Sequence, residues 1–151
     1  MNTENTGRLI PGIAVVGAGY WGINHVRNYM QMEVLQAVCD TDPGCVDRIT
    51  KLYPNLRIEP DYERLLRDPA VNGIVIATPA ETHYHVARHA IEAGKDVLVE
   101  KPLTLDVDKG LELVERAASK RAVLMVGHLL EYHPAVLRLR ALISSGALGE
   151  I

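Results

Sequence analysis

The sequence lacks a long apolar run, an excess of charge of one sign and enough cysteines for a disulfide framework. A membrane-spanning helix needs roughly 18 or more apolar residues, but the stretches 9–23 and 122–130 are interrupted by glycine, proline or histidine. The 16 basic and 19 acidic residues leave a formal charge of −3, too small to indicate a nucleic-acid or membrane surface. Cys39 and Cys45 have no zinc-type spacing around them, so both are interpreted as reduced thiols, with Cys39 buried and inert.

The first residues, MNTENTG, carry no basic charge, and no small-residue cleavage pattern follows them. No secretory signal is therefore predicted, and a cytoplasmic location is expected. What the sequence does contain is 48% hydrophobic residues in a chain of 151, which is enough for one packed domain and too apolar for a disordered chain. The expected partner is a small molecule, with no nucleic acid and no membrane.

Short apolar runs of strand length alternate with longer segments of helical period. Several runs are continuous in valine, isoleucine and leucine, as in strands that are covered on both faces. The alternation predicts an α/β fold, a Rossmann-type doubly wound parallel sheet with helices on both faces. The runs lie at 13–16, 34–39, 56–58, 73–77, 96–99 and 123–126.

The segments between the runs carry helix signals at their ends. Pro43 suits the first turn of one helix, and Asp61 suits the N-cap of a helix over 62–67. Gly94 is a natural stop for a helix over 81–93. These residues predict where three of the helices begin or end.

Two further helices are predicted nearer the end of the chain. Thr104 is the expected cap of a helix that continues to Lys120, and a final helix is expected over 134–144. In the first of these, apolar residues recur at spacings of four, three and four, which predicts one buried stripe. The stripe consists of Val107, Leu111, Val114 and Ala118.

The sharpest motif is GAGYWG, which directly follows the run 13–16 and precedes a helical segment. In a G-x-G-x-x-G between strand and helix, Gly17 makes the tight turn, Gly19 lets the backbone approach a pyrophosphate and Gly22 lets the helix pack on the strand. The pyrophosphate then faces the positive end of the helix. A glycine turn without a ligand is the alternative. The cofactor-binding residues predicted from this motif are Gly17, Ala18, Gly19, Tyr20, Trp21 and Gly22.

Asp40 stands at the end of the second run. In a dinucleotide fold a carboxylate at this place accepts hydrogen bonds from the ribose hydroxyls and repels a 2′-phosphate, so NAD is favoured over NADP. Thr41 is assigned to the same site. Asp42 is a nearby competitor for the ribose, and a solvated loop aspartate is the alternative for Asp40.

Two other run ends carry polar groups, Ala77-Thr78-Pro79 followed by His83, and Glu100-Lys101-Pro102. Ligands of open parallel sheets bind at the carboxyl ends of strands, so both segments are expected near the cofactor. Desolvation would lower the pKa of a lysine at such a place and make it usable in acid–base chemistry. The residues alone leave open a surface lysine without a catalytic role.

The segments GAGYWG, ATPAETHYHVA, AGKDVLVEKPL and GHLLEYHPA, together with Asp40, resemble the Gfo/Idh/MocA family of NAD(P)-dependent oxidoreductases. The EKP tripeptide is its most specific motif. The resemblance implies that Lys101 is the catalytic lysine near the nicotinamide and the substrate hydroxyl, with Glu100 beside it and His128 near the substrate. It also implies that the cofactor channel is lined by Ala77, Thr78, Pro79 and His83.

By this resemblance the protein is an NAD-dependent dehydrogenase that acts on a hydroxyl of a sugar, a cyclitol or a nucleotide-sugar. We expect an extended or disordered tail over 1–9, a dinucleotide-binding domain over 10–130, and over 131–151 a helix with the start of a C-terminal α/β substrate domain. The ending GALGEI resembles the entry into that domain, so a truncated form, inactive alone, is expected. Apolar surface there is compatible with a homo-oligomer. The alternative is a stand-alone dinucleotide-binding or sensing module that pairs with another chain.

His83, His85 and His89 form a histidine cluster, and the last two share one helix face at a spacing of four. Two histidines at this spacing can bind zinc when a third ligand is present. No carboxylate or thiolate stands at a suitable spacing, so no metal site is predicted.

Overall fold

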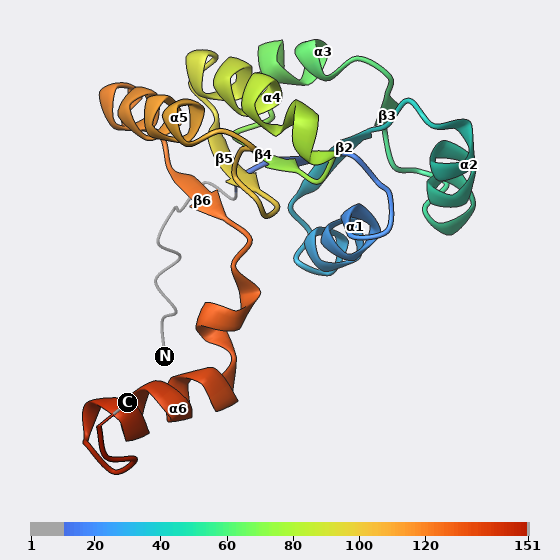
Figure 1. The fold of residues 1–151 in the computed structure, drawn as a ribbon. Coiled ribbons are helices and arrows are strands. Elements are labelled where there is room, and N and C mark those ends of the chain that lie inside the picture. Colours follow the sequence, from blue (N-terminus) through green and yellow to red (C-terminus); the bar gives the residue numbers. More distant parts are fainter. Residues whose placement is uncertain (1–10, 151) are drawn as a thin grey trace, which may run out of the picture.

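The computed structural model describes residues 11–150 and contains a six-stranded sheet of order β3-β2-β1-β4-β5-β6 (Figure 1). Every neighbouring pair of strands is parallel. This is the strand order of the Rossmann fold, and the direction of winding changes between β1 and β4. The expected tail, 1–9, lies outside the described residues. The strands are β1 (Ile13–Val16), β2 (Leu35–Cys39), β3 (Ile58–Glu59), β4 (Gly73–Ile76), β5 (Asp96–Val99) and β6 (Leu124–Val126).

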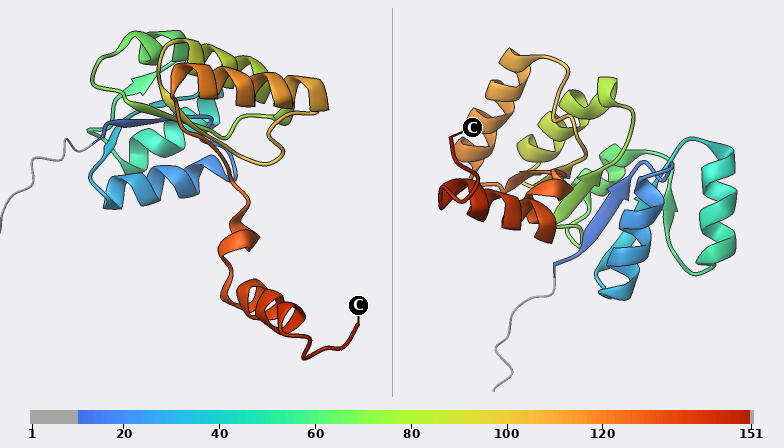
Figure 2. Two further views of the ribbon diagram at one scale, coloured as in Figure 1. Left: turned by 90° about the vertical axis from the view of Figure 1, so that its left-hand side faces the viewer. Right: turned by 60° about the horizontal axis from the view of Figure 1, so that its bottom comes forward.

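The helices cover both faces of the sheet, as predicted (Figures 1 and 2). On one face lie α1 (Gly22–Gln31) and α2 (Pro43–Leu52), and on the other lie α3 (Tyr62–Arg67), α4 (Ala80–Glu92) and α5 (Val107–Lys120). From β1 the chain adds strands toward one edge of the sheet, and from β4 it adds them toward the other edge. Because the crossovers between parallel strands are right-handed, the two directions place their helices on opposite faces.

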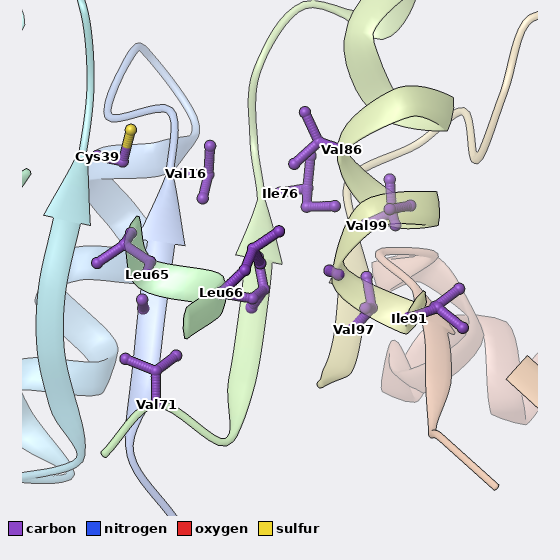
Figure 3. Close-up of a cluster of buried hydrophobic side chains, with 14 of the residues drawn as sticks. Val16, Cys39, Leu65, Leu66, Val71, Ile76, Val86, Ile91, Val97 and Val99 are labelled. Carbon is purple, nitrogen blue, oxygen red and sulfur yellow. The ribbon is translucent and has the colours of Figure 1, made fainter. Parts of the chain in front are cut away.

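The core consists of two apolar layers, one on each face of the sheet. The larger layer packs side chains of α3 and α4 on the strands, with Leu65, Leu66, Val86 and Ile91 among its buried members (Figure 3). The smaller layer lies beneath α1 and α2. Because successive strand side chains point to opposite faces, both layers draw on each central strand, which explains the unbroken apolar runs of the sequence.

The predicted helix ends at Pro43, Asp61 and Gly94 are confirmed. Pro43 is the first residue of α2, and Asp61 is the N-cap of α3 and accepts a hydrogen bond from the Glu63 N–H at 2.9 Å. Helix α4 ends at Glu92, two residues before Gly94, which has φ +75°, a conformation that side-chain-bearing residues rarely adopt. Local chemistry therefore sets these three boundaries.

The predicted cap of α5 is wrong. The helix begins at Val107, and its N-cap is Asp106, whose carboxylate accepts a hydrogen bond from the Lys109 N–H at 3.0 Å. The Thr104 hydroxyl donates to the Asp106 carbonyl instead. Thr104 thus closes a short turn ahead of the helix, and the residue two positions later takes the capping role.

The predicted buried stripe of α5 is also wrong. Val107, Leu111 and Val114 are 80%, 58% and 55% exposed, whereas Leu113 and Ala117 are buried. Ala118 is exposed as well. The helix packs beside α4 at the margin of the sheet and turns the Leu113 face inward. The spacing was helical, but α5 has two apolar faces and periodicity does not tell which one meets the core.

The last helix, α6 (Pro134–Ser144), has the predicted bounds. It follows the 3₁₀ helix η1 (Leu129–Tyr132), packs mainly against it, and lies away from the sheet and its helix layers (Figure 2). None of its residues is buried. Within residues 11–150, no helix combines the length and the apolar character needed to cross a membrane.

Candidate functional site

The loop from Gly17 to Gly22 connects β1 to α1 at the carboxyl edge of the sheet. Two of its glycines have a steric reason within the protein. Gly17 has φ +90°, and a Cβ at Gly22 would lie 2.0 Å from the Gly17 carbonyl oxygen. A Cβ at Gly19 would meet no atom within 4 Å. The protein itself therefore leaves room for a side chain at Gly19, and that room is available to a ligand.

Asp40 holds this loop in place. Its carboxylate accepts a hydrogen bond from the Ala18 N–H at 2.6 Å and another from the Asp42 N–H at 2.8 Å. The Arg48 guanidinium donates to the Ala18 carbonyl oxygen at 2.6 Å. An ionised carboxylate has about four acceptor positions, so Asp40 retains acceptor capacity after these two bonds.

Asp42, the competitor for the ribose, is the N-cap of α2. It accepts a hydrogen bond from the Cys45 N–H at 2.7 Å, and this bond is the main reason why the pKa of Asp42 is lowered. Its carboxylate is thus engaged at the start of α2, whereas the Asp40 carboxylate directly follows β2 and contacts the glycine loop.

A cavity of about 530 Å³, here called the glycine-loop cavity, opens between this loop and the end of β4. Its wall includes the thiol of Cys39, whose pKa is raised to about 11, first by burial and then by the negative charge of Asp40. Such a thiol stays protonated near neutral pH. The cavity brings together seven predicted cofactor residues, namely Gly17, Gly19, Asp40, Thr41, Ala77, Thr78 and Pro79.

A second cavity of about 560 Å³, here called the Lys101 cavity, lies where β5 and β6 end. It is lined by Trp21, Glu100, Lys101, His128 and neighbouring residues, so it joins the far end of the glycine loop to the predicted catalytic residues. The side chains of Lys101 and His128 are exposed. The burial that the sequence argument invoked for Lys101 is therefore not provided by residues 11–150.

Glu100 is a buried carboxylate in the wall of the Lys101 cavity. Its Oε1 lies 2.8 Å from His25 Nε2, and its Oε2 accepts a hydrogen bond from the Lys101 N–H at 3.3 Å. A Cβ at Gly127 would lie 3.1 Å from this carboxylate, so glycine there makes room for Glu100. His25 was not predicted from the sequence, although a polar residue in the first turn after the glycine loop is a usable signal for such a contact.

Four predicted residues line neither cavity. Ala18, within the loop, is buried, and both of its backbone polar groups make hydrogen bonds. Gly22 is buried at the start of α1, and Tyr20 is 88% exposed. His83, expected in the cofactor channel, is 1% exposed and lines neither cavity. Its ring contacts the carbonyl oxygens of Thr78 and Pro102.

The other members of the histidine cluster point to separate places. His85 is exposed, and His89 Nδ1 lies 2.9 Å from the Tyr62 hydroxyl. Across residues 11–150, no group of three or more histidine, cysteine, aspartate or glutamate side chains is placed to hold a metal ion.

Comparison with known proteins connects this site to a family. Residues 12–128 match the family model described as an oxidoreductase family with an NAD-binding Rossmann fold, GFO_IDH_MocA. UDP-N-acetylglucosamine 3-dehydrogenase of Acidithiobacillus ferrooxidans is 34% identical over 128 residues, which cover 83% of this chain and 39% of that protein. Inositol 2-dehydrogenase of Acidothermus cellulolyticus is 35% identical over 141 residues, which cover 91% and 41%.

Solved structures show the same relation. The crystal structure of GenD2 from gentamicin A biosynthesis, in complex with NAD, matches with a TM-score of 0.83 and 31% identity over 91% of this chain and 40% of that one. The chain thus spans about 40% of the length of the curated relatives and of the solved structure it matches.

Proposed function

The chain belongs to the Gfo/Idh/MocA family of oxidoreductases, and from this premise we propose that it provides the cofactor site and a proton-transfer lysine of an NAD-dependent dehydrogenase. The substrate class is a sugar, a cyclitol or a nucleotide-sugar that carries a hydroxyl at the reacting carbon. Two relatives support this class by their names, UDP-N-acetylglucosamine 3-dehydrogenase and inositol 2-dehydrogenase.

The open space at Gly19, beside a cavity that reaches Asp40, is the observation that carries the proposal. A pyrophosphate fits at Gly19 because the backbone can approach it closely and the positive end of α1 begins at Gly22. Asp40 accepts hydrogen bonds from the adenosine ribose, with Thr41 beside it. Thr78 and Pro79 form the opposite wall. A dinucleotide laid across the loop then extends from the glycine-loop cavity to Trp21 in the Lys101 cavity.

Lys101 takes or returns the proton of the substrate hydroxyl. Bound NAD supplies the hydride acceptor for this chemistry. Glu100, anchored by His25 and by the Lys101 N–H, holds the end of β5 from which Lys101 projects. His128, across the same cavity, contacts the substrate.

We expect the 151-residue chain to bind NAD(H) with little or no turnover. Its Lys101 and His128 side chains are exposed, so residues 11–150 do not exclude water from the reacting centre, which hydride and proton transfer require. The free thiols of Cys39 and Cys45 support a cytoplasmic location as part of the same proposal.

The cofactor site is tested by titrating the chain with NADH and NADPH in separate experiments. Trp21 is the only tryptophan and lines the Lys101 cavity, so quenching of its fluorescence and energy transfer to the nicotinamide report binding. Saturable binding that favours NADH is expected. A preference for NADPH would contradict the role of Asp40, and absence of binding by both would contradict the cofactor proposal.

Two variants sharpen the titration. Gly19→Val places a side chain where the protein has free space, so the unfolding free energy should stay within about 0.5 kcal/mol while NADH binding is lost. Asp40→Asn removes the charge of the side chain but keeps its size. It should lower the affinity for NADH by about tenfold or more, because charge-assisted hydrogen bonds contribute ~1.5 to 3 kcal/mol. The same substitution should also reduce the difference between the affinities for NADH and NADPH. Unchanged NADH affinity in Gly19→Val would place the dinucleotide elsewhere.

A further inference from the structure

His83 is a buried titratable side chain for which the proposed reaction has no use. It lies in the first turns of α4 and is 1% exposed. Its Nδ1 lies 2.7 Å from the Pro102 carbonyl oxygen and its Nε2 lies 2.8 Å from the Thr78 carbonyl oxygen. Both ring nitrogens thus meet a main-chain carbonyl at hydrogen-bond distance.

Both partners are main-chain carbonyl oxygens, which only accept hydrogen bonds, so the His83 ring is the donor toward this pair. A ring that lies within 2.8 Å of both oxygens fixes the distance between the two segments to which they belong.

The two carbonyls belong to segments that follow different strands of the sheet. Thr78 follows β4 and lines the glycine-loop cavity, and Pro102 follows Lys101 at the end of β5. Main-chain pairing of these strands extends to the Glu100 N–H, which donates to the Ile76 carbonyl oxygen at 2.9 Å. Beyond that bond the His83 ring contacts both segments.

We propose that His83 is a positioning residue whose ring bridges the Thr78 and Pro102 carbonyls and thereby sets the position of Lys101 relative to the glycine-loop cavity. The significance of that position rests on the proposed function. The bridge itself does not, because it consists of two contacts inside the folded chain.

The bridge is measured on the wild-type chain. The protein is labelled with ¹⁵N-histidine, and the His83 ring is assigned among the six histidines as the signal lost in His83→Gln. We expect a ring N–H of His83 to be protected from exchange with water, because it donates to a main-chain carbonyl inside the folded chain. A His83 ring whose protons all exchange as fast as those of an exposed histidine would overturn the proposal.

The positioning role is measured by NADH affinity in matched variants on the same helix. His83→Leu removes both donors and should raise the Kd for NADH at least tenfold. His83→Gln keeps a donor and should recover part of the loss. His85→Leu, at an exposed position, should bind NADH as the wild type does. Circular dichroism and urea unfolding show whether each variant is folded.

The outcomes separate the two proposals. A folded His83→Leu that binds NADH as tightly as the wild type overturns the positioning role. If His83→Leu does not fold, the ring spectrum of the wild type decides. A wild-type chain that binds no NADH contradicts the proposed function, and the protection of the His83 ring proton is still read directly from the spectrum.

Discussion

The thiol of Cys39 shows how the position of one residue sets its chemistry. Cys39 is the last residue of β2, is 4% exposed and immediately precedes Asp40. Burial disfavours the thiolate and the neighbouring carboxylate adds to this effect, so the pKa rises from an ordinary value of 9.0 to about 11. Unfolding removes the burial, which is the larger of the two causes, whereas Asp40 stays next to Cys39 in the chain.

This difference predicts a specific loss of stability at high pH. Between pH 9 and 11 the unfolded thiol loses its proton while the folded one keeps it, so the unfolded state binds fewer protons and the unfolding free energy falls as pH rises. The contribution is about 2 to 3 kcal/mol over that window. Urea unfolding of wild type and Cys39→Ala between pH 8 and 11 measures it as a difference of slopes. Parallel curves for the two proteins would show that the shift is absent.

At the scale of one element, α5 has two apolar faces, of which one is buried and the other is exposed. The face with Leu113 and Ala117 is buried beside α4, and the face with Leu111 and Val114 is exposed. Both faces have helical spacing, so the sequence pattern is equally compatible with either orientation. Packing against α4 and the sheet selects the Leu113 face.

The two leucines of α5 therefore form a matched pair of substitutions. Leu113→Ala removes a fully buried side chain and should lower the unfolding free energy by about 2 to 5 kcal/mol, the cost of lost burial and a cavity. Leu111→Ala, at a 58% exposed position, should change it by less than about 0.5 kcal/mol. Urea denaturation of both variants measures the difference. Equal effects would mean that the outer face of α5 is also covered in solution, and a larger effect of Leu111→Ala would mean that α5 packs in the other orientation.

At the scale of the whole molecule, the candidate site exists only because strands distant in the chain end side by side. Asp40 follows β2, Thr78 follows β4 and Lys101 follows β5, and the parallel sheet brings all three to one edge. The winding changes direction between β1 and β4, which opens the crevice where ligands of such sheets bind. The two cavities lie along this edge.

A ligand that bridges these strand ends should stabilise the whole fold. Binding to the folded state alone adds about 2.7 kcal/mol when the free ligand is at 100 times its Kd. Thermal unfolding of the wild type should shift upward with NADH concentration, whereas Gly19→Val should show no shift. A shift of the same size in Gly19→Val would indicate that NADH binds away from the glycine loop.

Much of the fold was predictable because its signals are local. Each of the six apolar runs overlaps one of the six strands. Pro43, Asp61 and Gly94 mark helix ends because each acts through its own backbone or its nearest neighbours. The α5 cap failed for the same kind of reason, since Thr104 and Asp106 are both good capping residues and only the turn between them selects Asp106.

The site divides in the same way. The sequence by itself determined the glycine loop, the acidic residue that follows the second strand and the lysine that follows the fifth, because spacing and strand ends are encoded locally along the chain. Only the tertiary structure decided that Glu100 meets His25, that the Ala18 backbone lies between Asp40 and Arg48, and that His83 spans two carbonyls. These contacts join residues that are brought together by the crossovers of the sheet and the packing of its helices, and no local pattern encodes such distances.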